Sequence, residues 1–253
     1  MHFPWSPPWK TAGCDLSLKV AALYIYPVKA CAAVALERAQ IEPLGLAGDR
    51  RYALVSDNGV AITQRDCPAL ATVRPTLEGD ALRLDLGGLA AVSIDHFIDP
   101  IIVDVWGKRI RALAAPERLT SPIADFVGKR LRVVRLDPGS ERSFADSRPV
   151  LVTTSSMLAA LNSRLEKIVG MERFRPNIVL DGDIDARPLR GREVALEYEK
   201  PCERCEVTTI DQASGERRGP EPLETLTERF GGQFGLYYRV SRPGQLERGE
   251  ELN

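Results

Sequence analysis

The sequence predicts a mainly β protein with a few helices, an α+β fold in which β-barrels are decorated by helices. Short apolar runs recur along the chain and are separated by Gly, Asp, Asn and Pro, the pattern typical of strands joined by turns. Helical spacing is confined to a few short segments, which argues against a doubly wound sheet. With 253 residues, 44% of them hydrophobic, the chain can form one large domain or two modest ones around a sizeable core.

The first half of the chain is predicted to be mostly strands. Its apolar runs are "VAALYIY", "RYALVSD", "LRLDL", "AVSID" and "IIVDVWG", and "SDNGVAI" indicates a hairpin turn. The segment "LTSPIADFVGKR" predicts a short helix with Ser121 as its N-cap and Pro122 at its first position, followed by the strand "LRVVRL". The polar stretch "LDPGSERS" then marks a boundary. We therefore predict an N-terminal arm over 1–17, a first domain over 18–136 and a second domain over 137–253.

The second half is predicted to mix strands with two helices. The segment "TTSSMLAALNSRLEKIVG" indicates a helix that ends at Gly170 and turns one apolar stripe to the core, namely Met157, Leu161, Leu165 and Ile168. Strands are expected at "NIVLDG", "EVALEYE", "EVTTID" and "LYYRVSR", with the short helix "PLETLTERF" between the last two. No glycine-rich loop has the spacing of a dinucleotide or P-loop site.

Composition narrows the classes of function. The 34 basic residues nearly cancel the 35 acidic ones, so no overall field recruits nucleic acid or an anionic membrane, and an anion site must be a local cluster. Five dispersed cysteines do not form a disulfide framework and favour a reducing compartment, so we expect a cytoplasmic protein. The first residues, rich in Pro and Trp, match neither a signal peptide nor a transmembrane segment, and a surface arm is expected there.

Two cysteines in "PCERCEVTTIDQASG", Cys202 and Cys205, admit several chemistries. Structural zinc needs four ligands, yet the other candidates are isolated cysteines and two histidines. A redox dithiol usually places its nucleophile at a helix N-terminus, whereas "EVTTID" indicates a strand. One thiolate beside Arg204 would be a soft ligand for a transition metal. A pair of buried structural cysteines also accounts for the pattern. The cysteines alone leave these alternatives open.

Three basic segments stand beside turn residues. They are "YPVKAC" with Lys29, "GLAGDRRYALV" with Arg50 and Arg51, and "RFRPNIV" with Arg175 and Asn177. Each alone is commonly a surface charge, but guanidinium and ammonium donors from several loops together match the needs of a phosphate-bearing cofactor. The asparagine would add an amide hydrogen bond to such a ligand, or close a turn. The sequence does not show whether these side chains converge.

In their order along the chain, seven segments resemble the MOSC superfamily, specifically the pairing of an N-terminal β-barrel with a MOSC domain found in amidoxime-reducing molybdenum enzymes. The segments are "YPVKAC", "GLAGDRRYALV", "ITQRDCPALA", "FADSRPVLVTTSSMLAALNSRL", "FRPNIVLDG", "PCERCEVTTIDQASG" and "FGLYYRVSRPGQLERGEEL". The resemblance spans Leu18 to Leu252. It implies a β-barrel-like N-terminal domain packed with a MOSC β-barrel domain, and a cofactor site shared between them.

The resemblance implies a molybdenum cofactor, Mo-molybdopterin, whose metal is bound by Cys205 as the catalytic thiolate, with Cys202 as a neighbour without a metal bond. It further implies that the cofactor is held by Lys29, Arg50, Asp146, Ser147, Arg175, Asn177, Glu203 and Arg204. For the last two residues the backbone is the expected contact. Ala30 stands where eukaryotic members usually have a serine, which removes one hydroxyl donor from the expected pocket.

The activity implied by the resemblance is two-electron removal of oxygen from N-hydroxylated small molecules. The cofactor would carry the chemistry, while the protein holds the metal and the phosphate. Some bacterial relatives carry a further iron–sulfur domain and this sequence ends at "RGEELN", so an external electron-transfer protein of ferredoxin-like, flavin or haem type is expected. Two alternatives remain: a carrier of the cofactor or its sulfur without turnover, and a thiol–disulfide oxidoreductase that uses both cysteines.

Overall fold

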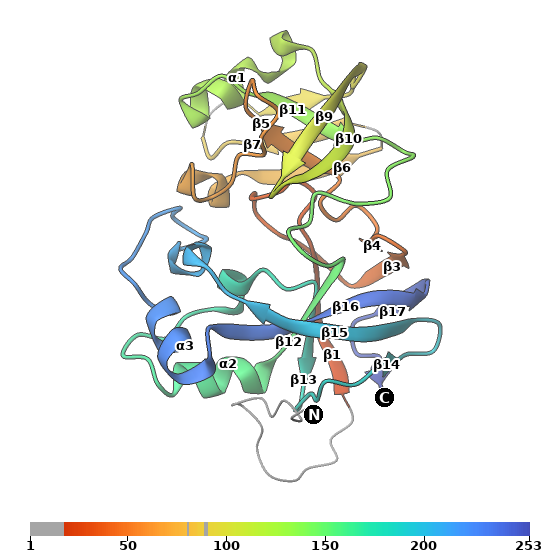
Figure 1. Cartoon of the computed structure of the whole chain (residues 1–253), viewed down its shortest axis with the longest axis vertical. Helices are drawn as coiled ribbons and strands as arrows, with labels where there is room; N and C mark the ends of the chain where they lie inside the picture. The colour runs from red at the N-terminus through yellow and green to blue at the C-terminus, as the bar shows by residue number, and fades with distance from the viewer. Residues whose placement is uncertain (1–17, 80, 89–90) are drawn as a thin grey trace.

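The computed structural model describes residues 18–79, 81–88 and 91–253, so the predicted N-terminal arm lies outside the described residues. The predicted mainly β fold with helices is confirmed: strands dominate, and three α-helices lie among the described residues. The strands gather into two lobes stacked along the long axis of the molecule (Figure 1). We call them the upper lobe, which holds β5 to β11 with α1, and the lower lobe, which holds the remaining strands with α2 and α3.

The lower lobe is built on an eight-stranded sheet in the order β14-β15-β16-β12-β13-β1-β18, with β2 paired to β1. Its strands are β1 (Leu18–Ile25), β2 (Val34–Leu36), β12 (Val150–Thr154), β13 (Ile178–Asp181), β14 (Leu189–Arg190), β15 (Ala195–Glu203), β16 (Gln233–Arg242) and β18 (Glu251–Leu252). Within this sheet β12 and β13 run parallel, because helix α2 (Ser155–Asn162) crosses between them. Helix α3 (Leu223–Phe230) packs against β16.

A small sheet at the side of the lower lobe has the order β17-β3-β4. Its strands are β3 (Arg38–Glu42), β4 (Gly45–Leu46) and β17 (Gly244–Glu247). The upper lobe contains one sheet in the order β5-β11-β10-β9 and another in the order β6-β7-β8. Their bounds are β5 (Tyr52–Val55), β6 (Arg74–Glu78), β7 (Ala81–Asp85), β8 (Val92–Ile94), β9 (Asp99–Val105), β10 (Lys108–Ala114) and β11 (Arg132–Leu136).

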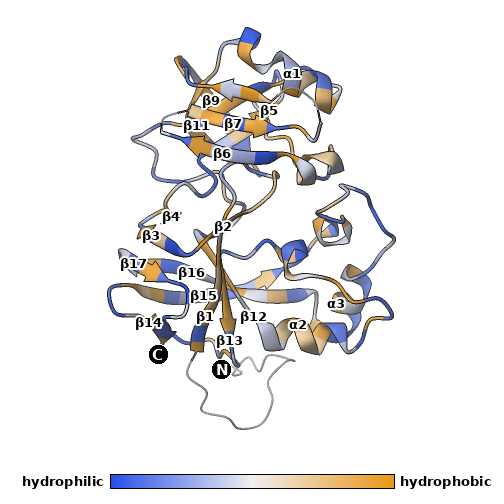
Figure 2. Ribbon diagram, turned by 180° about the vertical axis from the view of Figure 1, so that it is seen from behind, coloured by the Kyte–Doolittle hydropathy of each residue, from blue (hydrophilic) through white to orange (hydrophobic). Residues whose placement is uncertain are grey.

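Each lobe has its own hydrophobic core, and the core of the lower lobe includes residues from both halves of the chain. The lower-lobe core draws on buried residues from β1, β3 and β4 together with residues of the second half, whereas two clusters of apolar residues fill the upper lobe. Figure 2 shows the apolar colour concentrated on the strands of both lobes. Strand β1, which lies in the first predicted domain, pairs with β13 and β18 of the second. The predicted boundary at residue 136 stays a prediction, and the lobes interleave across it in space.

Helix α1 (Glu117–Val127) begins earlier than predicted. Ser121 is not its N-cap and Pro122 does not open it, because Pro116 occupies the N-cap and Pro122 lies inside the helix. A proline nitrogen cannot donate to the carbonyl four residues earlier, but Arg118 is exposed, so water can satisfy that carbonyl. The buried face of the helix and the left-handed Gly128 at its C-cap hold it together.

Helix α2 is shorter than predicted. Met157 and Leu161 are buried as expected, but the helix ends at Asn162, and Ile168 is 80% exposed. The Asn162 side chain accepts a hydrogen bond from the Val169 N–H and donates one to the Val169 carbonyl, both at 3.0 Å, which closes the following loop. Gly170 therefore does not cap α2 but precedes a short 3₁₀ helix, η2 (Met171–Phe174).

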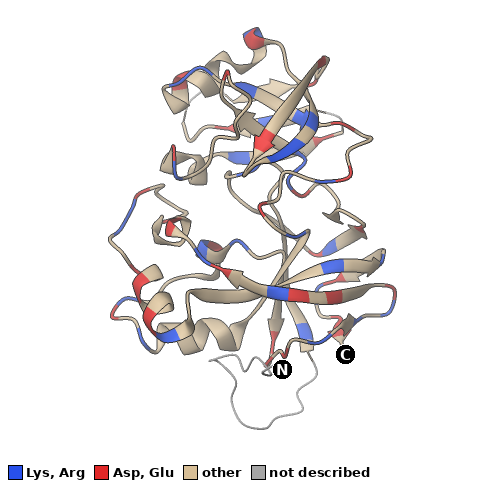
Figure 3. Ribbon diagram, viewed as in Figure 1, with Lys and Arg blue, Asp and Glu red and all other residues tan. Residues whose placement is uncertain are grey.

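In the view of Figure 3, basic and acidic residues are interspersed on both lobes. Among the described residues no helix is long and apolar enough to cross a membrane.

Candidate functional site

A cavity of about 280 Å³ lies between the lobes and is lined by residues of both. All nine residues that the resemblance assigns to the site line it, namely Lys29, Arg50, Asp146, Ser147, Arg175, Asn177, Glu203, Arg204 and Cys205. Arg51, noted beside Arg50 in the sequence, does not line it and pairs with Glu42 at 2.8 Å. They arrive from the turn after β1, the turn before β5, the segment that links the lobes, the turn before β13 and the end of β15. The structure thus brings together side chains that are up to 176 positions apart in the chain; whether they bind a cofactor stays a prediction.

Two arginines stand on strained backbone at the cavity. Arg50 and Arg175 have φ values of 48° and 53°, in the left-handed region that non-glycine residues rarely adopt. Each guanidinium lies 4.2 Å from the centroid of the Tyr26 ring, within the range of a cation–π contact. Arg50 Nη1 also donates to both carboxylate oxygens of Asp49, at 2.7 and 2.6 Å. This packing holds two cationic groups side by side before any ligand arrives.

Burial shapes the protonation of this cluster. Burial raises the pKa of Tyr26 to about 12, although the two guanidiniums act to lower it. Burial also lowers the pKa of Arg175 to about 10, against the influence of the Tyr26 phenol. Near pH 7 the phenol therefore stays neutral and the guanidinium stays charged. A buried cationic cluster of this kind favours a ligand that carries negative charge.

Lys29 is buried and reaches the same cavity. Its ammonium donates to the Phe144 carbonyl at 3.0 Å and forms an ion pair with Asp146. Burial lowers the pKa of Lys29, and the Asp146 carboxylate acts to raise it. Burial conversely raises the pKa of Asp146, but the neighbouring Lys29 ammonium and the Trp106 indole N–H outweigh it and hold that pKa below its usual range. Each partner of the pair thus favours the charged form of the other.

The two sulfurs of the motif have different surroundings. Cys202 lies in β15, is 1% exposed, and accepts a hydrogen bond from Arg204 Nη1 at 2.9 Å. Cys205 is half-buried on the cavity wall, and no described residue donates a hydrogen bond to its sulfur. Both thiols are free. The open sulfur is thus Cys205, the residue that the resemblance assigns to the metal.

The segment after Cys205 is not the predicted strand. Residues Glu206–Thr209 form a 3₁₀ helix, η3, with Cys205 at its N-cap. The hydroxyls of Thr208 and Thr209 donate back to the carbonyls of Cys205 and Glu206, so local hydrogen bonds override the β-branched composition. The strand that would disfavour a redox dithiol is therefore not formed, although η3 is only a single short turn.

Two expected ligand donors are already engaged in the fold. The Asn177 side chain accepts from the Leu151 N–H at 3.1 Å and donates to the Tyr24 carbonyl at 3.2 Å, which ties β1 to β12. The Arg204 backbone N–H donates to the Gly232 carbonyl at 2.8 Å and is not free for a cofactor. The Arg204 side chain, however, has its Nε buried without a hydrogen-bond partner among the described residues. Its free donor thus lies on the guanidinium and not on the backbone.

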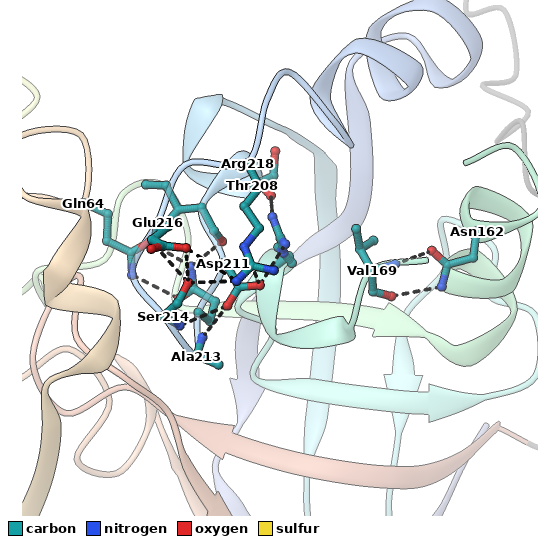
Figure 4. A network of polar contacts seen from close by, with 12 residues as sticks. Gln64, Asn162, Val169, Thr208, Asp211, Ala213, Ser214, Glu216 and Arg218 are labelled. Atoms are coloured by element: carbon teal, nitrogen blue, oxygen red, sulfur yellow. Dashed lines mark hydrogen bonds and ion pairs between the residues drawn. The ribbon is translucent and has the colours of Figure 1, made fainter. Parts of the chain in front are cut away.

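Sequence reasoning missed an amide pair that joins the lobes at the cavity. Gln64 and Gln212 exchange hydrogen bonds of 3.1 and 3.0 Å through their side-chain amides. Gln64 also donates to the Ala30 carbonyl at 2.7 Å, and Arg175 donates to Gln212 at 3.3 Å. Figure 4 shows Gln64 reaching toward the network around Asp211. Both glutamines lie inside segments that carry the family resemblance, and this was the signal in the sequence that could have identified them.

Among the described residues no group of three or more His, Cys, Asp or Glu side chains is placed to hold a metal ion. A metal at this cavity would therefore need ligands beyond one protein thiolate. A dithiolene-bearing cofactor supplies such ligands, and a soft thiolate suits the same metal. The buried cations, the unpartnered Arg204 Nε and the open Cys205 sulfur match the needs of an anionic group with a thiophilic metal.

Comparison with known proteins matches both halves of the chain. Residues 17–130 match the MOSC N-terminal beta barrel domain, and residues 139–253 match the MOSC domain. The chain is 30% identical to mitochondrial amidoxime-reducing component 1 of Homo sapiens, over 98% of this chain and 87% of that protein. It is 29% identical to molybdenum cofactor sulfurase of Drosophila melanogaster over 87% of this chain, and spans 31% of that longer protein. The YuaD protein from Bacillus subtilis is 13% identical, with a TM-score of 0.48 and 94% of each chain covered.

Proposed function

This chain belongs to the family that joins a MOSC N-terminal β-barrel domain to a MOSC domain, and from that premise we propose that it is a molybdenum-cofactor-dependent reductase of N-hydroxylated compounds. The relatives' names associate the family with the molybdenum cofactor and with amidoxime reduction. The observation that carries the proposal is the open Cys205 sulfur beside a cavity with buried cationic side chains.

The residues present fit the cofactor by their chemistry. Lys29, Arg50 and Arg175 would hold its phosphate and pterin, because a buried ammonium and two guanidiniums are suited to anionic oxygen. Arg204 would add its unpartnered Nε. The thiolate of Cys205 would bind the metal as a soft ligand. When bound, the cofactor supplies two-electron oxygen-atom chemistry that protein side chains lack.

Other residues of this chain prepare the site. Asp146 keeps the buried Lys29 ammonium charged, and Asp49 orients the guanidinium of Arg50. Burial, together with the neighbouring Cys202, raises the pKa of Tyr237, so this cavity-lining phenol keeps its proton at neutral pH. The proposal includes a separate electron-transfer protein of ferredoxin-like, flavin or haem type as the reductant, and a cytoplasmic location.

The test compares Cys205→Ala with Cys202→Ala after expression in a cofactor-competent, molybdenum-replete host. Molybdenum content, pterin fluorescence after oxidation, and turnover of an N-hydroxylated substrate with a chemical reductant are measured for each protein. We expect Cys205→Ala to lower turnover by more than about 100-fold, since loss of mere outer-shell partners already costs 10- to 100-fold. Cys202→Ala should keep metal and most turnover, because the Cys202 sulfur, which contacts Arg204 and Tyr237, is expected to make no bond to the metal.

Retained turnover in metal-replete Cys205→Ala would sink the ligand assignment. Equal loss in both variants, without molybdenum in the wild type, would instead favour a thiol–disulfide oxidoreductase.

A second candidate is a carrier that delivers the cofactor or its sulfur without turnover, favoured by the similarity to part of molybdenum cofactor sulfurase. The same cavity would serve both functions. Transfer of cofactor to an apo-acceptor enzyme, without turnover of any N-hydroxylated compound, would support the carrier over the reductase.

A further inference from the structure

The tip of the β9–β10 hairpin carries a residue that its turn does not favour. Val105 pairs with Lys108, so Trp106 and Gly107 form a two-residue loop. Their φ values are 55° and 77°, and positive φ at both positions defines a type I′ turn, which strongly prefers Asn-Gly or Gly-Gly. A bulky side chain with positive φ is an outlier that persists where surrounding contacts compensate for it. A large indole at this position is thus retained against the preference of the backbone.

The hairpin tip points this indole at the cavity. Trp106 lines the cavity and is 55% exposed, although most large apolar side chains of the described residues are buried. Its Nε1 donates to Asp146 Oδ1 at 2.6 Å, and Lys108 Nζ donates to the Asp146 carbonyl at 2.6 Å. The Arg65 guanidinium lies over the ring, 4.5 Å from its centroid. The ring is therefore fixed at one edge and covered on one face by a cation.

We propose that Trp106, backed by Arg65, forms a stacking subsite at the cavity mouth for a flat aromatic ring carried by the substrate. Arg65 covers one face and the indole is still more than half exposed, which leaves the other face for a ligand. The same cavity holds Cys205, so a ring stacked on Trp106 would present its reactive substituent toward the proposed centre. The expectation that this substituent is N-hydroxylated rests on the proposed function. The stacking subsite is inferred from the surroundings of Trp106 and does not depend on that function.

A purely structural role for Trp106 makes a different prediction. If the indole served only to anchor Asp146 through its N–H, a residue with a donor that suits the turn would replace it without loss. Trp106→Asn offers such a donor and the favoured turn residue, but no ring. Trp106→Phe keeps a ring but has no donor. The two variants therefore separate stacking from anchoring.

The experiment measures binding by calorimetry to cofactor-loaded protein without reductant, so that no turnover occurs. The probes are benzamidoxime and cyclohexanecarboxamidoxime, which share the head group and differ in the flatness of the ring. We expect the wild type to bind the aromatic probe about 3- to 10-fold more tightly, the range of an aromatic pair. Trp106→Asn should abolish this preference, and Trp106→Phe should keep part of it. Trp106→Asn should also unfold at the same or a higher temperature, because the turn is relieved.

An unchanged preference in Trp106→Asn, or equal binding of both probes to the wild type, would overturn the subsite. A clear fall in the unfolding temperature of Trp106→Asn would likewise show that the indole is structural. Turnover of the same probes with a chemical reductant is recorded in parallel. If Trp106-dependent preference is found without turnover, the reductase proposal fails while the subsite stands.

Discussion

The sulfurs of Cys202 and Cys205 show how neighbouring residues of one type acquire different chemistry. Arg204 donates to the buried Cys202 sulfur, and the same guanidinium donates to the Phe174 carbonyl at 2.8 Å. Both cysteines line the cavity, but Cys205, two residues beyond the end of β15, is only half-buried there. A hydrogen-bonded, buried thiol is poorly accessible to a metal, whereas a thiol on a cavity with nearby cations is suited to bind one. Their comparison is therefore the most informative pair of substitutions at this site.

A third thiol, Cys31, should make folding sensitive to alkaline pH. It is fully buried in an upper-lobe core, and burial raises its pKa from 9.0 to about 12. Above pH 9 the unfolded chain releases this proton while the folded protein retains it, so stability present at lower pH is lost as pH rises. The free energy of unfolding should be lower by about 1 kcal/mol at pH 10 because of this thiol. Urea unfolding at pH 8 and pH 10 measures it.

Between pH 8 and pH 10, the free energy of unfolding should fall by about 1 kcal/mol less for Cys31→Ala than for the wild type. Comparison by difference is needed because the raised pKa of Tyr26 acts in the same direction. Val28→Ala serves as the control: Val28 is fully buried in the same core but does not titrate, so this variant should keep the wild-type pH dependence. Equal losses in Cys31→Ala and the wild type would contradict the prediction.

At the scale of elements, polar side chains decide where regular structure stops. The Thr154 hydroxyl accepts from the Met157 N–H and begins α2, as an N-cap does, and Asn162 closes the loop that follows it. Figure 4 shows the two hydrogen bonds between Asn162 and Val169. The hydroxyls of "EVTTID" similarly turn a predicted strand into η3. In each case one or two local hydrogen bonds outweigh the apolar periodicity.

Asn162→Ala should destabilise the lower lobe by about 1–2 kcal/mol, because two hydrogen bonds to the Val169 backbone are lost from a half-buried site. Urea unfolding measures this loss, as a lower midpoint with an unchanged dependence of the unfolding free energy on urea concentration. The neighbouring exposed Ser163 donates one hydrogen bond to the Ala160 carbonyl, and Ser163→Ala should change stability by less than about 0.5 kcal/mol. Similar effects of the two variants would show that the loop does not depend on the asparagine.

At the scale of the whole molecule, the cavity depends on how the lobes meet. Besides the amide pair of Gln64 and Gln212, Arg217 donates to the Arg65 carbonyl at 3.2 Å and to Glu206 at 2.6 Å. The loop that carries Gly215 lies against the 3₁₀ helix η1 (Pro68–Thr72) of the upper lobe. These contacts help to set how the cavity-lining residues of the upper lobe lie relative to Cys205 in the lower lobe.

Gly215→Ala should separate the lobes, and Gly219→Ala is its matched control. Both glycines have positive φ, 70° and 81°, so either substitution should cost about 1 kcal/mol in backbone strain. At position 215 the new Cβ would lie 2.9 Å from the Ala69 Cα, whereas at 219 nothing lies within 4 Å. Gly215→Ala should therefore lose a further 1–3 kcal/mol, by the approximate cost of overpacking.

The lobe contact also predicts a functional difference between these variants. Gly215→Ala should be purified with less bound cofactor than Gly219→Ala, because its clash moves the upper-lobe residues that line the cavity. Unfolding by urea and molybdenum content per chain measure the two effects. Equal stability and equal metal content in both variants would show that η1 yields to the methyl group without moving the cavity.

The sequence by itself determined the fold class, the family and nine of the residues that line the cavity. Strand and turn signals are local, so the mainly β fold follows from apolar runs and from glycine, proline and aspartate between them. Lys29, Arg50, Arg175 and Asn177 stood out because they lie beside turn residues, and the others were implied by the resemblance of their segments to the family. Element ends were less predictable: Pro122 lies inside α1 and not at its first position, and Ile168 lies beyond the end of α2, where it is exposed.

Only the tertiary structure decided how each of those residues is used. The amide of Asn177 makes hydrogen bonds to two strands. The Cys202 sulfur accepts a hydrogen bond from Arg204, and Trp106 donates one to Asp146, which is 40 positions away in the sequence. Strand β1 likewise contacts a distant segment, because it pairs with β13 in the second half of the chain. Such outcomes depend on contacts between distant segments, whose energies exist only once the chain has folded, whereas strand and turn preferences act on neighbouring residues before it does.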